Sequence, residues 1–218
     1  MCGRYTLRAT LNLILDQFAA EAGEGLHLEP QFNIAPTNAV PIIRRGERGR
    51  ELSLARWGLI PSWAKDEKIG YSTINARADS VAAKPAFRAA FKRRRCLVVA
   101  DGYYEWIADG KEKQPILYEV GKPGDVFAMA GLWESWHDIE SCTIITTTPN
   151  KLAAEAHDRM PVILKEKDYD RWLDPKLEDA SQLEPLLSPY SGKMASRPVS
   201  RYVNNVRNKG PECVESPA

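Results

Sequence analysis

The middle of the chain constrains the fold most, because it consists of short apolar runs separated by turn residues. Asp101-Gly102 marks a turn or bulge after the most apolar run, and Asp109-Gly110 is a strong hairpin signal. Runs that follow one another through such turns usually pair antiparallel, so this region predicts an antiparallel, barrel-like β-sheet. The segments expected to be strands here are 96–100, 103–107, 114–120, 126–132 and 141–148.

Helical patterns flank these strands. In Thr10–Ala20, four apolar residues fall on one helix face, and Pro85 opens a short helix. Further helix-like stretches are 150–156, 166–173 and 177–187, and two more strands, 40–44 and 51–57, flank a glycine turn. With no repeat or long linker, the sequence predicts one α+β domain over residues 1–218, a barrel-like antiparallel sheet flanked by helices. Residues from about 205 to 218 are polar and are expected to be a mobile tail.

Composition excludes several classes of protein. Apolar residues make up 44% of the chain, charged residues 27%, and the formal net charge is +1, which is typical of a soluble globular protein and excludes a general polycation. No run of apolar residues is long enough for a membrane span, and the expected location is the cytoplasm, or the nucleoid when bound to DNA. Four cysteines without CxxC spacing and three histidines predict neither a metal site nor a cofactor. Cys96 and Cys142 lie in apolar runs and are expected to be buried thiols.

Cys2 is the first candidate for chemistry. Methionine is readily trimmed before a small residue, and trimming of Met1 would give Cys2 a free α-amine beside its thiol. The amine can condense with an aldehyde to an imine, which the thiol then closes to a thiazolidine ring. Alternatively, the amine serves as base for its own thiol, as in N-terminal nucleophile hydrolases. The simplest alternative is a small residue near a frayed chain end.

Three polar residues stand where a purely structural residue is unexpected. Asn75 interrupts a strand-like context, where it either binds a reacting group or satisfies a turn. Glu105 lies between two aromatic residues, and burial there would raise its pKa toward neutrality; a place on the solvent face of its strand is the alternative. His157 stands in a polar turn and is able to shuttle a proton, or simply ends a helix.

Cations and aromatic residues suggest a nucleic-acid ligand. Arg4, Arg77 and Arg159 each lie close in sequence to a candidate site residue. The basic run 92–95 is interpreted as a solvated helix end. Trp57 is expected in the core, whereas Trp63, in a loop with proline and lysine, is the better stacking candidate.

Together these pieces resemble the SOS-response-associated peptidase family, also called abasic-site-processing proteins. The resemblance spans roughly residues 2–172, and six motifs in family order are far more specific than any one alone. The motifs are Met1-Cys2-Gly3-Arg4-Tyr5, Phe32-Asn33-Ile34-Ala35-Pro36, Arg56-Trp57-Gly58-Leu59-Ile60-Pro61, Ile74-Asn75-Ala76-Arg77, Ala100-Asp101-Gly102-Tyr103-Tyr104-Glu105-Trp106 and His157-Asp158-Arg159-Met160-Pro161.

The resemblance implies a cleft for single-stranded DNA, and a thiazolidine crosslink between Cys2 and an abasic site that shields the lesion from strand cleavage. It also implies lyase-type Schiff-base chemistry and self-processing peptidase activity, which here need remove only Met1. The implied catalytic residues are Cys2, Asn75, Glu105 and His157. The implied DNA-binding residues are Arg4, Pro36, Trp63, Arg77 and Arg159.

Two other readings remain open at this point. An N-terminal nucleophile amidohydrolase would use the Cys2 thiol on an amide, but would leave Glu105 and His157 without a clear task. A non-catalytic nucleic-acid-binding module would bind intact and abasic strands alike. The expected partners are single-stranded DNA containing abasic sites and the replication machinery, and the chain is expected to be a monomer.

Overall fold

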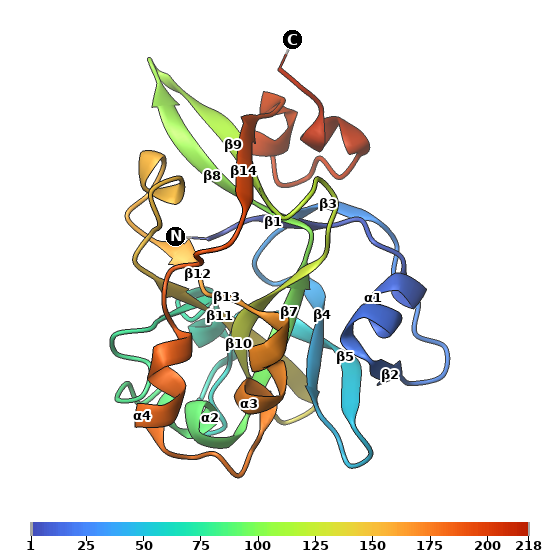
Figure 1. Ribbon diagram of the computed structural model, residues 1–218, viewed down its shortest axis with the longest axis vertical. Coiled ribbons are helices and arrows are strands. Elements are labelled where there is room, and N and C mark those ends of the chain that lie inside the picture. The colour runs from blue at the N-terminus through green and yellow to red at the C-terminus, as the bar shows by residue number, and fades with distance from the viewer. Residues whose placement is uncertain (1, 218) are drawn as a thin grey trace.

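The computed structural model describes residues 2–217, and its central feature is a closed barrel (Figure 1). Going round the ring, β11 pairs with β10, β10 with β7, β7 with β4, β4 with β5, and β5 with β11 again. The predicted barrel-like sheet is therefore confirmed. The barrel strands are β4 (Ala39–Arg45), β5 (Arg50–Trp57), β7 (Arg95–Ala100), β10 (Phe127–Trp136) and β11 (Ile139–Thr147).

The barrel encloses the main hydrophobic core. Every residue of β7 is buried, and this strand pairs with β4 on one side and β10 on the other. A strand buried over its whole length is expected to be mainly apolar, which explains the continuous apolar run 96–100; Arg95, at the start of β7, is the exception. Trp57 is fully buried, as expected, and so are the thiols of Cys96 and Cys142.

A second, antiparallel sheet projects from one end of the barrel (Figure 1). Its strands lie in the order β14-β9-β8-β1-β3, and β8 and β9 form the hairpin predicted at Asp109-Gly110. Asn33 and Ile34 belong to β3, and a turn follows from Ala35. The strands are β1 (Tyr5–Leu7), β3 (Gln31–Ile34), β8 (Gly102–Asp109), β9 (Glu112–Val120) and β14 (Met194–Pro198).

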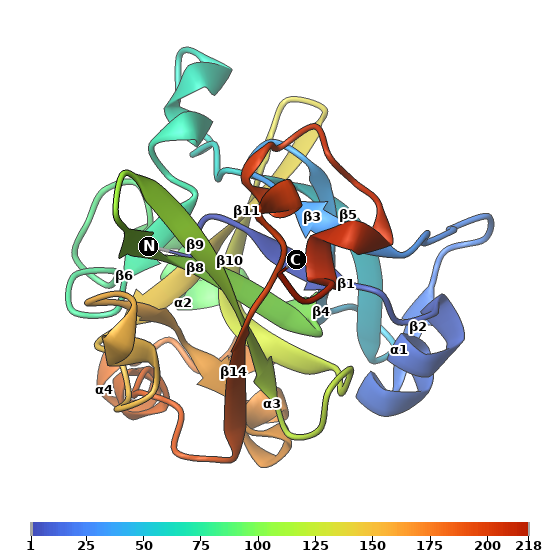
Figure 2. The ribbon, with the colours of Figure 1, turned by 90° about the horizontal axis from the view of Figure 1, so that it is seen from above.

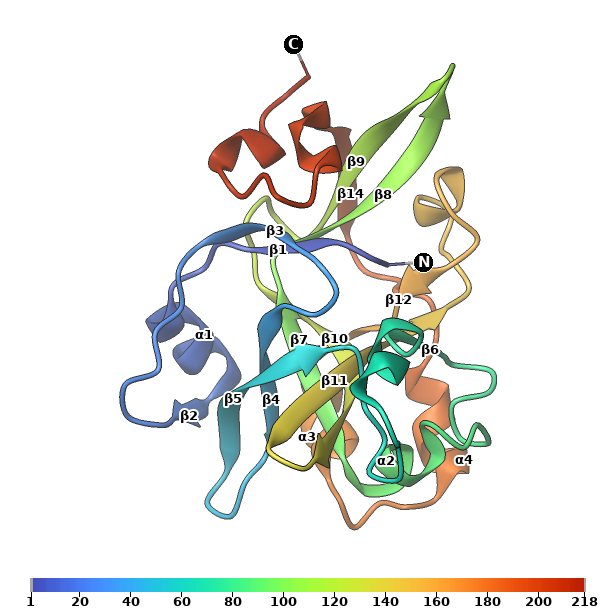
Figure 3. The same ribbon diagram turned by 180° about the vertical axis from the view of Figure 1, so that it is seen from behind.

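The sheet that forms the barrel is mixed, which corrects the expectation that it is antiparallel throughout. Both β5 and β6 run parallel to β11, and β2 runs parallel to β5 (Figure 3). The pairing of β5 and β6 follows from the path of the chain. After β5 the chain makes a long excursion, and it then returns as β6 beside β11, running in the same direction as β5. The short strands are β2 (Ala20–Ala22), β6 (Asn75–Arg77), β12 (Met160–Pro161) and β13 (Ile163–Leu164).

Helices cover the outside of the sheets, mostly as short turns. In α1 the Thr10 side chain caps the first turn, and Ile14 and Phe18 are buried on the predicted face. The longer helices predicted near 166–173 and 177–187 each break into a 3₁₀ turn and a short α-helix. The α-helices are α1 (Leu11–Phe18), α2 (Arg88–Arg93), α3 (Tyr169–Leu173) and α4 (Ala180–Leu183). The 3₁₀ helices are η1 (Glu67–Tyr71), η2 (Ala153–Glu155), η3 (Glu166–Asp168), η4 (Glu184–Leu186), η5 (Arg201–Asn204) and η6 (Pro211–Val214).

The basic run 92–95 is not solvated throughout, because Arg95 is only 2% exposed. Its guanidinium donates to the backbone carbonyls of five residues, which joins β7 to the ends of α2 and α3. The interpretation as a solvated helix end is therefore wrong for Arg95. The five accepting residues are Phe91, Lys92, Trp172, Asp174 and Leu177.

The C-terminal segment, residues 199–215, packs against the second sheet beside β1 and β3 (Figure 2). Val203 and Cys213 are fully buried there in a small hydrophobic cluster with Tyr104 and Leu117. The mobility expected for residues 205–218 stays a prediction. Among residues 2–217, no helix has the length and apolar character that crossing a bilayer requires.

Candidate functional site

A pocket of about 540 Å³ opens at the second sheet and collects several of the predicted residues. Glu105 reaches it from β8, His157 from the segment after η2, and Arg4 from the residues just before β1. The sequence separates these three residues widely, and the fold brings them to one cavity. Among residues 2–217, the lining consists of Arg4, Glu105, Trp106, Lys113, His157 and Asn204.

Glu105 is buried, with 5% of its surface exposed, rather than lying on a solvent face. Burial raises its pKa to about 7, because a carboxylate loses hydration when it leaves water. The neighbouring charge of Asp158 adds to this rise. Near neutral pH, Glu105 therefore exists in both protonation states and is suited to general acid and base catalysis.

Cys2 is fully buried and packs in the main hydrophobic core. Burial raises the pKa of its thiol, and the negative charge of Glu105 raises it further. The charge effect places the thiol within electrostatic reach of the pocket carboxyl. The thiol is consequently protonated near neutral pH and is a poor nucleophile by itself.

His157 is held in a turn by its neighbours. Burial lowers the pKa of its imidazole, so the neutral ring is favoured near pH 7. In that form Nδ1 accepts a hydrogen bond from the backbone N–H of Arg159 at 3.0 Å, which leaves the ring proton on Nε2. Protonation of Nδ1 would instead favour the Asp158 carboxylate, 2.7 Å away. The two contacts therefore belong to different protonation states of the ring.

Asn75 begins β6, where it pairs with Ile144 of β11. Its Nδ2 donates to the carbonyls of Ile74 at 3.1 Å and Ile144 at 3.4 Å. Among the described residues, its buried Oδ1 accepts no hydrogen bond. A buried amide oxygen without a donor is costly, which makes this atom a candidate acceptor for an ammonium group. Asn75 does not line the pocket.

Two of the predicted DNA-binding arginines share one carboxylate. Arg77 makes two hydrogen bonds to Asp79, at 2.7 and 3.2 Å, and Arg159 lies 3.7 Å from the same carboxylate. Arg159 also donates to the carbonyl of Thr146. Its position two residues after His157 places this arginine pair next to the pocket without lining it.

The third arginine, Arg4, lines the pocket and is anchored by one nitrogen. Its Nη1 donates to Asn33 Oδ1 at 2.6 Å and to the carbonyl of Val203 at 3.0 Å. The guanidinium carbon lies 5.5 Å from the ring centroid of Trp106, in cation–π geometry. Burial lowers the pKa of Arg4, although the group stays charged at any physiological pH.

Pro36 and Trp63 lie outside the pocket lining. Pro36 is half-buried in the turn between β3 and β4, whereas Trp63 is 59% exposed on the excursion between β5 and β6. That excursion is pinned where Gly58, with φ of 125°, packs on the Gly70 backbone; a Cβ at Gly58 would lie 2.5 Å from the Gly70 carbonyl oxygen. Trp63 is thus an exposed ring on an anchored loop.

Sequence reasoning missed three residues of the pocket wall. The sequence contains several aromatic residues and does not single out Trp106. Its position next to Glu105 in β8 is the feature from which a place near the site could have been predicted. Lys113 could have been found from the Asp109-Gly110 hairpin, because the register pairs it with Ala108. Asn204 arrives from the distant C-terminal segment, and no local pattern announces it.

No group of three or more histidine, cysteine, aspartate or glutamate side chains within residues 2–217 is arranged to hold a metal ion. The arrangement instead offers a thiol, a carboxyl with a pKa near neutrality, a neutral imidazole and several cations. These groups suit proton transfer and covalent chemistry on an anionic substrate.

Comparisons with known proteins point in one direction. The model of the SOS response associated peptidase (SRAP) family matches residues 1–206. The abasic site processing protein YoqW of Bacillus subtilis is 45% identical over 226 residues, which cover 99% of this chain and 100% of that protein. The abasic site processing protein HMCES of Xenopus tropicalis is 32% identical over 227 residues, 88% of this chain and 68% of the other. A solved structure of a Bacteroides thetaiotaomicron protein has a TM-score of 0.87 at 28% identity, and the likeness covers 99% of both chains.

Proposed function

Because this chain belongs to the SOS response associated peptidase family, we propose that it processes abasic sites in single-stranded DNA by forming a covalent crosslink through Cys2. The observation that carries the proposal is that Glu105, whose pKa is about 7 and which lines a pocket with His157 and Arg4, acts electrostatically on the buried Cys2 thiol, which does not itself line the pocket. Removal of Met1, by self-processing or by ordinary methionine trimming, frees the α-amine of Cys2. Met1 itself lies outside the described residues.

The reaction starts at the open-chain aldehyde of the abasic sugar. The Cys2 amine attacks the aldehyde carbon and forms a carbinolamine. Protonated Glu105 gives a proton to the departing hydroxyl, which leaves as water, and the resulting iminium returns its N–H proton to the Glu105 carboxylate to leave a neutral imine. His157 stabilises the developing oxyanion or relays a proton, and Asn75 Oδ1 accepts a hydrogen bond from the amine to hold it in place.

The imine has two fates. Loss of the 3′ phosphate by β-elimination would break the strand, as a lyase does. Attack of the Cys2 sulfur on the imine carbon instead closes a thiazolidine, and the thiol proton ends on the nitrogen. Because this attack is intramolecular, its effective molarity reaches about 10⁵–10⁸ M in favourable cases, so ring closure is faster than strand cleavage.

The raised pKa of the Cys2 thiol favours a reaction in which the amine attacks first over the amidohydrolase reaction, in which the sulfur attacks first. An amidohydrolase needs the sulfur as its first nucleophile, and a buried, protonated thiol is poorly suited to that task. In the proposed reaction the amine attacks first, and the sulfur is needed only after the reactive carbon is tethered beside it. Glu105 and His157 then both have a task.

Single-stranded DNA fits the surroundings of the pocket. Arg77 and Arg159 carry cationic groups beside it for phosphate contacts, and the exposed Trp63 offers a ring on which a base stacks, with Pro36 as a wedge. An abasic residue has no base to unstack, which lowers the cost of entering a pocket. The remaining expectations, a monomer acting beside the replication machinery in the cytoplasm or nucleoid, stay predictions.

The decisive experiment mixes mature protein with a single-stranded oligonucleotide that bears one abasic site and analyses the products on a denaturing gel. Wild type should give a stable shifted band whose mass equals protein plus DNA minus one water. Cys2→Ala should give no stable band. Cys2→Ser should give only a labile imine, trapped by borohydride, together with strand-cleavage product.

Two controls sharpen this test. Cys142→Ala, which removes another buried thiol, should crosslink like wild type. An oligonucleotide with a tetrahydrofuran in place of the abasic sugar has no aldehyde and should bind without crosslinking. An equal yield of stable product from Cys2→Ser and wild type would exclude thiazolidine formation.

A further inference from the structure

Asn33 is the most densely bonded polar side chain near the pocket, although it does not line the pocket. It lies in β3 and is 1% exposed. Its Nδ2 donates to the backbone carbonyls of Val203 at 3.3 Å, Asn205 at 3.1 Å and Asn208 at 2.8 Å. Its Oδ1 accepts from Arg4 Nη1 at 2.6 Å. One amide therefore joins the C-terminal segment to the guanidinium of the pocket.

The anchoring leaves the other edge of Arg4 available. Nη1 is committed to Asn33 and to the Val203 carbonyl, whereas Nε and Nη2 donate to none of the described residues. The N–H groups of Nε and Nη2 form a planar fork whose spacing matches two oxygens of a phosphate. Because Arg4 and Glu105 line the same pocket, a phosphate inside the pocket can engage this fork.

The C-terminal segment is tied to the same wall at further points. Trp106 Nε1 donates to Asn204 Oδ1 at 2.7 Å, and Asn204 Nδ2 donates to the Lys113 carbonyl at 3.2 Å. Lys209 Nζ donates to the backbone carbonyl of Asn33 at 2.5 Å. The segment thus forms hydrogen bonds with three residues of the pocket lining, Arg4, Trp106 and Lys113. The Lys209 contact lies beyond residue 206, where the match to the family model ends.

We propose that Asn33 is a positioning residue that fixes the Arg4 fork toward the phosphate next to the abasic sugar, with the C-terminal segment as its support. This inference rests on the proposed function, since the ligand of the fork is the DNA backbone. A guanidinium already held in place loses little side-chain entropy when it binds a phosphate. The role proposed for the segment is to orient this guanidinium, although one of its residues, Asn204, also lines the pocket.

A structural role for Asn33 makes a different prediction, and a double-mutant cycle separates the two. Affinity is measured for a single-stranded oligonucleotide that carries a tetrahydrofuran, so that binding is observed without chemistry. Asn33→Ala should weaken binding about tenfold in the wild-type background, as expected for a mispositioned charged contact. In the Arg4→Ala background the same change should weaken binding less than about twofold. Equal losses in both backgrounds would overturn the proposal.

Gln114→Ala is the matched control. Gln114 Nε2 also donates to a carbonyl of the C-terminal segment, that of Val199 at 2.8 Å, but it makes no contact with Arg4. The two variants therefore share a loss of anchoring, and only Asn33→Ala releases Arg4. Gln114→Ala should leave the affinity for the tetrahydrofuran strand unchanged, and a tenfold loss there would contradict the assigned role of Asn33.

A second variant keeps the test decisive if Asn33→Ala does not fold. Arg4→Lys preserves the charge but has a single nitrogen in place of the three of arginine. It therefore cannot bond to Asn33 and present a two-nitrogen fork to a phosphate at the same time. It should weaken binding about as much as Arg4→Ala, with a salt dependence like that of wild type because the charge remains. Full affinity in Arg4→Lys would overturn the proposal. Crosslinking by wild type reports on the proposed function separately.

Discussion

The barrel and the second sheet both bury an ionisable side chain, with different outcomes. In the barrel, five backbone carbonyls surround the Arg95 guanidinium, and its pKa falls only to about 10, so it remains a cation at neutral pH. In the second sheet, Glu105 reaches a pKa of about 7, so both its protonated and its ionised forms are present at neutral pH. Burial shifts both groups, but only the second shift ends in the physiological range. Arg95 thus keeps a fixed charge that joins elements of the fold, whereas Glu105 is able to exchange a proton near neutral pH.

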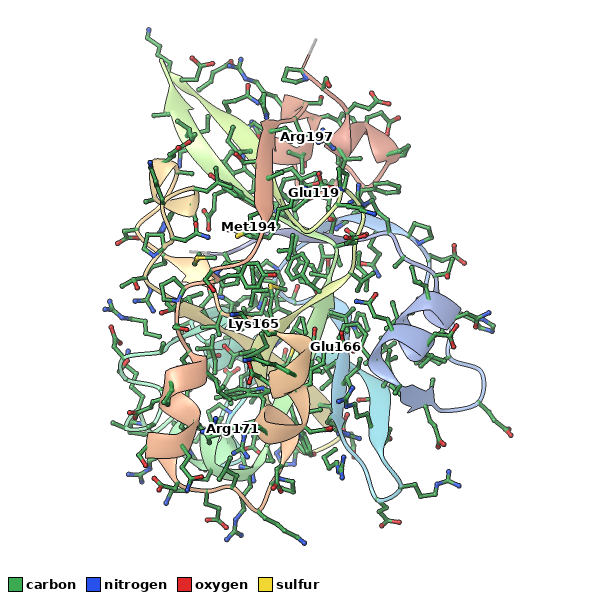
Figure 4. All side chains as sticks on the ribbon, viewed as in Figure 1. Glu119, Lys165, Glu166, Arg171, Met194 and Arg197 are labelled. Carbon is green, nitrogen blue, oxygen red and sulfur yellow. The ribbon has the colours of Figure 1, made fainter. Side chains whose placement is uncertain are left out.

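The largest expected effect is on the reactivity of the second sheet. Glu105→Gln should slow crosslinking to an abasic strand by about 10²–10⁴-fold, because the amide neither gives nor takes a proton. Single-turnover kinetics on denaturing gels measure the rate. Glu119→Gln is the matched control. Glu119 is equally buried in this sheet, but it pairs with Arg8 at 3.0 Å and with Arg197 at 3.6 Å. Figure 4 shows Glu119 and Arg197 beside each other on this sheet. The Glu119→Gln protein should be less stable but should crosslink at the wild-type rate. A similar loss of crosslinking rate in both variants would contradict a specific role of Glu105.

The next effect belongs to the barrel. Arg95→Met should lower the free energy of unfolding by about 3–4 kcal/mol, because several buried carbonyls lose their donor. Urea denaturation monitored by tryptophan fluorescence measures the change. Arg93→Met, which removes only an exposed ion pair with Glu178, should cost less than about 1 kcal/mol. Crosslinking by folded Arg95→Met should match wild type, and a rate loss larger than its loss of folded protein would contradict a purely structural role.

The pH dependence of stability should also distinguish the two regions. The pKa of Glu105 is raised in the folded state above its ordinary value of 4.5, so the unfolded chain releases this proton first. Stability is therefore lost as pH rises from about 4.5 through about 7. Relative to Glu105→Gln, wild type should lose about 2–3 kcal/mol across this window, measured by urea denaturation at both ends. A constant difference between the two proteins would show that the folded state does not hold the carboxyl protonated.

The smallest expected effect concerns the exposed loop. Trp63→Ala should weaken binding of a single strand by about 1–2 kcal/mol, because one stacking platform is lost, while stability stays within about 0.5 kcal/mol. Fluorescence anisotropy and thermal unfolding measure the two quantities. Leu54→Ala, at an exposed apolar position of β5, should change neither. Unchanged affinity in Trp63→Ala would remove this residue from the DNA-binding set.

The sequence predicts the barrel better than the second sheet, for a physical reason. The barrel strands β7, β10 and β11 are buried over most of their length, so their apolar runs are continuous and easy to recognise. The strands β1, β3 and β14 are short or polar, and distant segments pair with them. Glu105 was identified from its aromatic neighbours, but burial decided between its two possible faces. Asn33 and Asn204 matter through contacts with residues about 170 and 98 positions away, which no local pattern records.

The excursion between β5 and β6 begins and ends on the same strand. Trp57 lies beside Cys142 of β11, and Asn75 lies beside Ile144, only two residues further along. The two ends of the loop are thus fixed to neighbouring positions of β11. Exchanging this cassette for one of another length should cost little closure entropy, since that cost grows only logarithmically with length. Protein engineers could therefore change the surface around Trp63 without rebuilding the barrel beneath it.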